Sequence, residues 1–323
     1  MVDAPAPIVS LERCEEYSRA RVRAAIRSLL APLGGMKAFV RPGARVLLKP
    51  NLIVPRLIAA AVTTHPEIVR AVALEVREAG GKPSVGDSPA FGSALGVARK
   101  CGIAAVASEL EMPLVDLGKR PCPRHVGDDS PFPWLSFGAA ALEADVIINL
   151  PKIKTHGQMG MSLGTKNLFG CVAGKRKALL HFRNGEDHLR FGRMLVAIAR
   201  YFKPALTIAD GIVALERDGP TEGDPRKLAL LAASADVVAL DRVVIELLGV
   251  DPAMVPYMEA ARRMDFGCQD LGRIRIVGQP LDSMRAGVYV RIVELTPIRF
   301  SFPRVIRSVF KQAVLLVKMR RQR

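Results

Sequence analysis

The chain has 323 residues, half of them hydrophobic, which is enough for one large α/β domain or two modest ones. Its formal net charge is +16, and its five cysteines form no CxxC pair, which excludes a zinc ribbon or a ferredoxin-type cluster encoded in this chain. Neither a secretory leader nor a stretch long enough to span a bilayer is predicted, so we expect a cytoplasmic protein.

The first half of the chain alternates between predicted helices and strands. The segment 63–81 carries the clearest helix signals, with Thr64 as cap, Pro66 in the first turn and Glu67 completing a capping box. The other elements expected here are a helix over 11–31, a strand within 41–51, a strand over 82–88, a helix over 93–110, a strand over 112–117 and a long loop over 118–136.

The second half continues the alternation and sets the fold class. Its expected elements are a buried strand over 144–152, a glycine-rich segment, a helix over 187–202, a strand over 205–211, a loop over 217–225, a strand over 227–234, a helix over 234–249 and a last strand over 273–278. Such alternation predicts an α/β fold with a mostly parallel sheet flanked by helices.

Polar residues follow several of the predicted strands. In open parallel sheets, ligands bind just beyond the carboxyl ends of the strands, so residues at these ends are candidates for a common site. They are Lys49 and Asn51, then Asp87 and Ser88, then Asn149, Lys152, Lys154 and His156, and finally Asp210. The alternative is that each strand end simply becomes polar where it reaches water.

The segment 152–181 is basic and rich in glycine. It holds five lysines, one arginine, two histidines, five glycines and no acid. Lysines add positive charge and glycines, Gly164 and Gly170 among them, allow close approach of backbone N–H groups, which suits an anionic substrate or cofactor. We expect Lys152, Lys154 and Lys166 to neutralise that ligand, and Asn51 and Asn167 to orient it. The alternative is a solvated loop with ordinary basic residues.

Histidines and aspartates supply the candidate catalytic groups. His156 and His181 flank Lys166 in the sequence, and Asp87 and Asp210 are expected at the same sheet edge. This set predicts a general base for acid–base chemistry. A metal site with His156 and His181 as ligands stays open, although no HxH or HExxH spacing supports it. His65, at a helix start, is expected to belong to the helix cap.

Several motifs occur together in one order and carry a family resemblance. They are VLLKPNL, TTHPEIVRA, VGDSP, INLPKIKTH, GTKNLFG, the downstream KRK…H, IADGI and the DGP loop. This series resembles the family called domain of unknown function 362, from about residue 43 to 278. Some members of that family carry an added 4Fe-4S ferredoxin-like domain; the present sequence lacks the cysteines, so no iron–sulfur cluster is expected in it. The resemblance implies a fold and a site region, not a reaction.

The spacing of His156, Lys166 and His181 is also similar to the His…Lys…His layout of the nickel-pincer lactate racemases. That similarity implies Lys166 as a covalent attachment point for the cofactor, with His156 and His181 flanking the metal. The GTHRP element of the racemases has no counterpart, and their DxTRP element is replaced by KPNL (49–52).

The end of the chain is a distinct basic tail. Residues 285–323 hold ten Lys or Arg and one acid, and 302–323 (FPRVIRSVFKQAVLLVKMRRQR) predict a basic amphipathic helix. Such a helix can lie on an anionic membrane surface, dock on a partner or pack on its own core. We therefore divide the chain into an α/β core (1–284) and a basic amphipathic tail (285–323). Nucleic acid is not expected as a partner, because no aromatic platform interleaves the charge.

Three functional hypotheses follow. The first is a cytoplasmic enzyme, of the oxidoreductase or isomerase kind, that binds an anionic small molecule or cofactor at segment 152–181 for acid–base or redox chemistry. The second is a non-catalytic carrier or redox-partner module that docks acidic proteins or the inner membrane face through its basic edge and tail. The third is a nickel-pincer-type racemase-like enzyme. Substrate, metal and oligomeric state do not follow from the sequence.

Overall fold

The computed structural model describes residues 5–174, 176–184, 187–285 and 294–295. Within these ranges no helix is long and apolar enough to cross a bilayer. The expectations placed on residues 302–323, including the amphipathic helix, lie outside the described residues, and the division at residue 284 stays a prediction.

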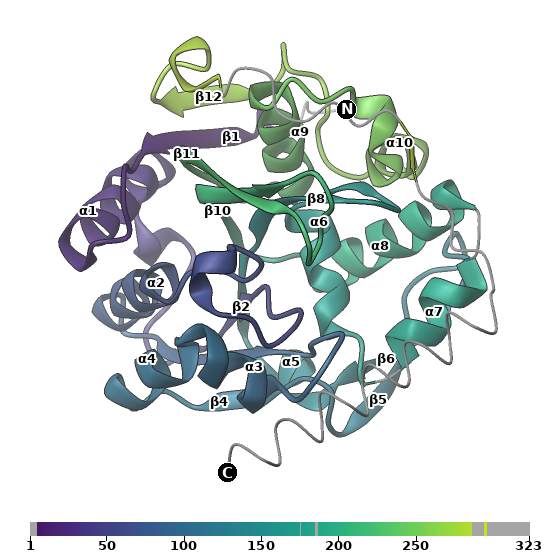
Figure 1. The fold of residues 1–323 in the computed structure, drawn as a ribbon, viewed down its shortest axis with the longest axis horizontal. Helices are drawn as coiled ribbons and strands as arrows, with labels where there is room; N and C mark the ends of the chain where they lie inside the picture. Colours follow the sequence, from purple (N-terminus) through teal and green to yellow (C-terminus); the bar gives the residue numbers. More distant parts are fainter. Residues whose placement is uncertain (1–4, 175, 185–186, 286–293, 296–323) are drawn as a thin grey trace.

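A large mixed sheet runs through the middle of the molecule (Figure 1). Its main path has the order β12-β1-β11-β10-β7-β2-β3-β4, and β8 and β9 extend it beside β10. The strands are β1 (Ile8–Arg13), β2 (Arg45–Pro50), β3 (Lys82–Asp87), β4 (Leu114–Asp116), β7 (Val146–Leu150), β8 (Lys152–His156), β9 (Gly160–Ser162), β10 (Leu206–Glu216), β11 (Asp224–Ser234) and β12 (Arg275–Gly278). Neighbours from β10 to β4 are parallel, which confirms the predicted fold class.

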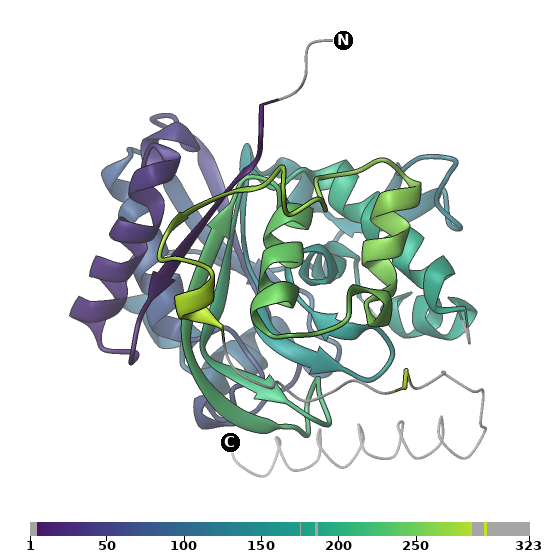
Figure 2. The same ribbon diagram turned by 90° about the horizontal axis from the view of Figure 1, so that it is seen from above.

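Helices cover both faces of this sheet (Figures 1 and 2). On one face lie α1 (Arg19–Leu30), α2 (Pro66–Glu78), α3 (Ala94–Cys101) and α4 (Ile103–Glu109). On the other lie α5 (Ala139–Glu143), α6 (Gly164–Asn167), α8 (His188–Phe202), α9 (Val237–Leu247) and α10 (Pro256–Arg263), with α7 (Arg176–Asn184) beside α8. Short 3-10 turns occupy Ala31–Leu33, Met36–Ala38, Ile58–Ala60, Leu168–Cys171, Pro252–Met254 and Asp282–Met284.

Several expected elements differ from the structure at their boundaries. The helix expected over 11–31 begins only at Arg19, because residues 8–13 pair with β11 as a strand. Gly102, in the left-handed region at φ 87°, divides the helix expected over 93–110 into α3 and α4. The loop expected over 118–136 contains β5 (Pro121–His125) and forms a separate two-stranded sheet with β6 (Trp134–Gly138).

The cap of α2 is also different from the one expected. His65, not Thr64, is the N-cap, and its Nδ1 accepts the backbone N–H of Glu67 at 3.2 Å. Thr64 instead donates its hydroxyl proton to the carbonyl of Leu150 at 2.7 Å, so it ties the loop before α2 to the end of β7.

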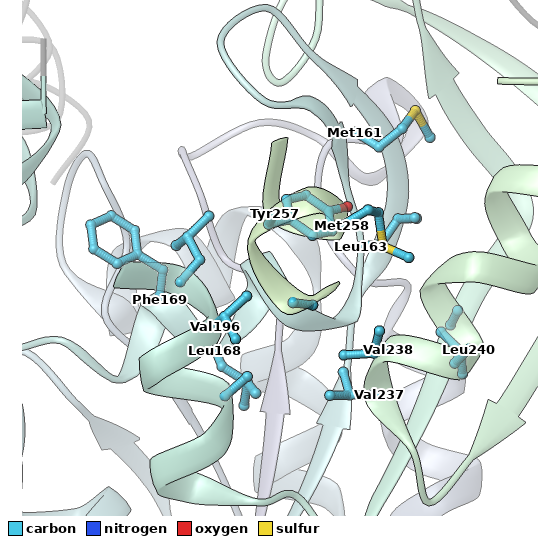
Figure 3. Close-up of a cluster of buried hydrophobic side chains, with 14 of the residues drawn as sticks. Met161, Leu163, Leu168, Phe169, Val196, Val237, Val238, Leu240, Tyr257 and Met258 are labelled. Atoms are coloured by element: carbon cyan, nitrogen blue, oxygen red, sulfur yellow. The ribbon is translucent and has the colours of Figure 1, made fainter. Parts of the chain in front are cut away.

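The segment 152–181 was expected to be a loop, but its described residues form strands and helices and are mostly buried, which does not fit the alternative of a solvated loop. Pro151 separates β7 from β8, and the chain then forms β9, α6 and α7. Figure 3 shows the apolar cluster that holds the centre of this segment in place. Leu163 and Leu168, at the two ends of α6, are fully buried there with residues of α8, α9 and α10 (Val196, Val237, Val238, Leu240, Tyr257 and Met258). Burial of this kind fixes the backbone that carries Lys166 and Asn167.

Candidate functional site

The carboxyl ends of β2, β3 and β7 bring Lys49, Asp87 and Asn149 together, as their strand positions predict. Lys49 Nζ lies 2.8 Å from Asp87 Oδ1, and both side chains are almost fully buried. Asp87 also accepts the backbone N–H groups of Leu52 and Ser88, at 2.7 and 2.8 Å. Its carboxylate is therefore committed to an ion pair and two hydrogen bonds, which does not favour the predicted role of Asp87 as a base.

Asn167 joins three elements at this edge. Its Nδ2 donates to Asn149 Oδ1 at 2.8 Å and to the carbonyl of Lys49 at 3.1 Å. Its Oδ1 accepts from Asn51 Nδ2 at 2.9 Å and from Lys49 Nζ at 3.3 Å. Asn167 thus fixes α6 against β2 and β7, and orients Lys49 and Asn51.

Lys154 is buried with neutral partners only. Its Nζ donates to Asn51 Oδ1 at 2.6 Å and to the carbonyl of Val62 at 2.7 Å. Burial, then the cations Lys166 and Lys152, hold the pKa of Lys154 well below its ordinary value. Within the described part of the chain, this amine has no carboxylate partner.

Lys152 belongs to a second ion pair at the same edge. Its Nζ lies 3.1 Å from Asp210 Oδ2 and 2.8 Å from the hydroxyl of Tyr17. Tyr17 donates that hydroxyl proton to Asp210 Oδ1 at 2.6 Å, and its ring stacks on His65 at 3.6 Å. Asp210 also accepts the backbone N–H of His65 at 2.9 Å, so its carboxylate is fully engaged like that of Asp87. Tyr17 was not predicted, because nothing in the sequence relates residue 17 to β10.

Lys166 has no hydrogen bond or ion pair with any residue that the structure describes, although it is only 9% exposed. Burial, together with the nearby cations Lys177 and Lys49, lowers the pKa of Lys166 to about 7. An amine in this state is uncharged in a substantial fraction of molecules at neutral pH, and it gains from any anion that reaches it.

Lys177, on the inner face of α7, completes the group of cations. Its Nζ hydrogen-bonds to the carbonyl of Ser88, and burial lowers its pKa to about 8. In the sequence, Lys177 is only one of three consecutive basic residues and carries no further signal. Among the described residues, the buried lysines of this edge are Lys49, Lys152, Lys154, Lys166 and Lys177, whereas the carboxylates paired with them are Asp87 and Asp210.

His156 and His181 lie beside Lys166 with parallel rings. Their ring centroids are 6.5 Å apart and their planes differ by 8°. Burial and the charge of Lys166 hold the pKa of His156 well below its ordinary value and lower that of His181 to about 3. Both imidazoles are therefore neutral at pH 7. His156 Nδ1 accepts the backbone N–H groups of Gln158 and Met159, and His181 Nδ1 lies 2.9 Å from Gln158 Oε1.

Asp241, on α9, anchors the start of α6. Its carboxylate accepts the backbone N–H groups of Gly164 and Thr165 at 2.7 and 2.8 Å. Because the carboxyl group is buried, its pKa is raised to about 7. Nothing in the sequence singled out this residue, since it reads as one polar position in an apolar helix.

The predicted glycines are required by packing within the protein. A Cβ on Gly170 would lie 2.0 Å from Asp87 Oδ1 and 2.5 Å from Lys49 Nζ, and one on Gly164 would lie 2.7 Å from a methyl group of Val237. Contact of these glycines with an anion stays a prediction.

The loop after β10 covers β8 without neutralising the lysines. Thr155 Oγ1 donates to the carbonyl of Arg217 at 2.9 Å and accepts the backbone N–H of Gly219 at 3.2 Å. The loop acids pair with arginines instead, as in Glu222 with Arg56 at 2.7 Å. The excess positive charge at the sheet edge is therefore left in place.

Open cavities occur elsewhere on the surface. One of about 250 Å³ and another of about 490 Å³ lie near the amino ends of β2, β3 and β7, at the opposite edge of the sheet. The lysines of the candidate site and His156 are buried, and His181 on α7 is partly buried.

A metal-binding arrangement is not evident around the histidines. Within the described ranges no group of three or more His, Cys, Asp or Glu side chains could hold a metal ion. The charged groups closest to the two imidazoles are lysines. Metal binding by His156 and His181 therefore stays a prediction from the sequence.

Residues 46–246 match the family model described as domain of unknown function (DUF362). The chain is 46% identical over 303 residues to the thylakoid-associated protein sll1697 of Synechocystis sp.. The aligned region covers 94% of this chain and 93% of that protein.

Two solved structures have weaker similarity to this chain. The lactate racemase apoprotein from Thermoanaerobacterium thermosaccharolyticum has a TM-score of 0.46 and 14% identity, over 72% of this chain and 55% of the racemase chain. A protein from Thermotoga maritima has a TM-score of 0.42 and 14% identity, over 67% of this chain and 55% of that chain. The matched region thus spans about half the length of both proteins.

Proposed function

We propose that this chain, which belongs to the DUF362 family, is an enzyme that binds an anionic small molecule among Lys154, Lys166 and Lys177. The name of the family records no activity, so the proposal depends on the geometry and charge of the site. The ligand carries a carboxylate or a phosphate, and the reaction is an acid–base conversion at the neighbouring imidazoles. This proposal keeps the first of the three hypotheses from the sequence and moves the catalytic role away from Asp87 and Asp210.

The observation that carries the proposal is the unpaired charge of Lys166. A buried ammonium group without a partner is costly, and proteins retain such groups mainly where function needs them. Two buried lysines of this edge have carboxylate partners, whereas Lys154 and Lys177 hydrogen-bond to neutral oxygens and Lys166 to no described residue. An anion supplies the missing negative charge.

The histidines supply the chemistry. His156 and His181 are neutral and lie next to the expected anion, so each can accept or share a proton with a bound ligand. A bound anion also opposes the lysine charge that disfavours protonated imidazole. Ligand binding therefore favours the protonation step that the reaction requires.

The experiment is a thermal-shift panel with anions at constant ionic strength. Inorganic phosphate, sulfate, oxalate and citrate are added to the wild type, to Lys166→Met and to Lys37→Met, an exposed lysine that serves as control. We expect at least one anion to raise the melting temperature of the wild type and of Lys37→Met, but not of Lys166→Met. A panel without any shift, or an equal shift in Lys166→Met, contradicts the proposal.

A second candidate function is peripheral association with a membrane. The support is the relative named as thylakoid-associated, together with the ten basic residues of 285–323. A basic amphipathic segment binds anionic lipid through both charge and apolar side chains. This candidate concerns location and partner, so it is compatible with the enzyme.

A further inference from the structure

The geometry points to Gln158 as the residue that makes the two imidazoles chemically different and donates a hydrogen bond to the bound anion. Gln158 lies between β8 and β9, and it is only 4% exposed. The two polar atoms of its side chain have different surroundings: Oε1 contacts His181, while Nε2 is buried and has no hydrogen-bond partner among the described residues. The inference rests on the proposed anion site and adds a residue to it.

The first task is to set the tautomer of His181. An amide oxygen only accepts hydrogen bonds, so the contact of 2.9 Å requires the proton of neutral His181 on Nδ1. The other ring nitrogen, Nε2, then carries a lone pair. His181 is therefore presented as a base.

His156 has the opposite tautomer. Its Nδ1 accepts the backbone N–H groups of Gln158 and Met159, at 3.2 and 3.3 Å, so the proton of the neutral ring is on Nε2. His156 is therefore presented as a hydrogen-bond donor. A ligand that reaches the Nε2 edges of both rings meets a donor on His156 and a lone pair on His181, which suits removal of a proton by His181 while His156 stabilises the negative charge left on the ligand.

The second role of Gln158 is to donate a hydrogen bond to the anion through Nε2. A buried amide N–H group without a partner costs free energy, so it identifies a place where an acceptor is missing. The cations nearest to His181, Lys166 and Lys177, attract an anion to the same place. An oxygen of a carboxylate or phosphate satisfies both the amide and the lysines.

The two tasks are separable by substitution. Gln158→Glu keeps an oxygen acceptor for His181 Nδ1 but removes the N–H donor and adds a negative charge. Gln158→Met removes both the acceptor and the donor at similar size. Loss of the positioning role therefore changes the tautomer of His181 in Gln158→Met but not in Gln158→Glu, whereas loss of the donor weakens anion binding in both variants.

The test is ¹⁵N NMR of the histidine ring nitrogens in the ligand-free wild type and both variants, with amide spectra to check the fold. We expect protonation of His156 on Nε2 and of His181 on Nδ1 in the wild type, the same His181 tautomer in Gln158→Glu, and a shift of its proton toward Nε2 in Gln158→Met. A wild-type His181 protonated on Nε2, or an unchanged tautomer in Gln158→Met, overturns the positioning role.

Binding of phosphate and oxalate is then measured by calorimetry. We expect both variants to bind at least about tenfold more weakly than the wild type, the equivalent of one charge-assisted hydrogen bond. Wild-type affinity in Gln158→Met overturns the donor role while leaving the proposed function in place. A wild type that binds neither anion contradicts the proposed function, and the ring spectra then decide the tautomer assignment alone.

Discussion

Lys166 is buried and has no anionic partner among the described residues, so it lowers the stability of the ligand-free fold. Its pKa falls from 10.5 to about 7, because the folded protein holds the ammonium form less tightly than water does. Between these pH values the unfolded chain binds more protons than the folded one, so stability rises with pH from about 7 toward 10.5. Below pH 7 the full penalty applies.

Lys166→Met removes that penalty. We expect the variant to be more stable than the wild type at pH 7 by about 2–4 kcal/mol, with a smaller gain at pH 9, since the wild type has by then lost the buried charge. Urea denaturation at both pH values measures the difference. The exposed Lys37→Met is the control, and a wild type as stable as Lys166→Met at pH 7 would refute the assignment.

At this scale several residues named from the sequence lie close together in the structure, while their roles stay predictions. Lys49, Lys152, Lys154, Lys166, His156 and His181 were named because they follow strand ends or stand in the basic segment, and the structure brings them to one sheet edge. Gln158 and Lys177 were missed, since a glutamine in a turn and a lysine in a basic run carry no signal by themselves. Asp87 and Asp210 were predicted as acid–base groups, but sequence spacing does not reveal that each is paired with a lysine.

The short helix α6 depends on a neighbouring element for its position. It has four residues, too few to be stable alone, and the Asp241 carboxylate on α9 satisfies the first two N–H groups. The pKa of Asp241 in the folded protein is raised to about 7, so the folded state binds more protons than the unfolded state between about pH 4 and 7. The stability contributed at Asp241 therefore falls as pH rises through this range.

Asp241→Asn tests the anchor. At pH 5 the wild-type carboxyl group is protonated and, like the amide, accepts well through one oxygen only, so we expect the free energies of unfolding of the two proteins to agree within about 1 kcal/mol there. The fall in stability between pH 5 and 7 becomes shallower. Asp251→Asn, at an exposed cap that accepts the N–H of Ala253, is the matched control. Equal pH profiles for wild type and Asp241→Asn would exclude the anchor role.

Long periodic elements were predicted well and interrupted ones were not. The helix expected over 187–202 is α8 (His188–Phe202), because an uninterrupted apolar face specifies one continuous element. The segment 152–181 was predicted as a glycine-rich, anion-binding loop, with a solvated loop as the alternative. In the structure its glycines are sites of close packing and its lysines are buried, a result of tertiary contacts with β2, β3 and α9 that local sequence does not encode.

The whole molecule combines a buried cationic site with a basic terminal segment. The alternation of strands and helices predicted the mostly parallel α/β fold, since few topologies satisfy that order. It did not predict that β1 pairs with β11 and β12, because these strands lie more than 200 residues from β1 in the sequence.

Removal of the basic segment tests the membrane candidate. A chain ending at Met284 loses a net charge of +9. We expect it to float with vesicles of anionic lipid at least about tenfold less than the full chain, and expect the full chain not to float with neutral lipid, because each basic residue contributes about 1 kcal/mol near an anionic surface. Equal flotation of both chains would rule out the tail as the membrane contact.

The measurement that most directly tests the anion site is the pKa of Lys166, followed by NMR of ¹³C-labelled lysine side chains and assigned by loss of the signal in Lys166→Met. We expect a pKa of about 7 for Lys166 without ligand and an increase toward 10.5 when phosphate or oxalate saturates the protein. A Lys166 that titrates near 10.5 in the ligand-free protein and does not respond to either anion would contradict the anion site.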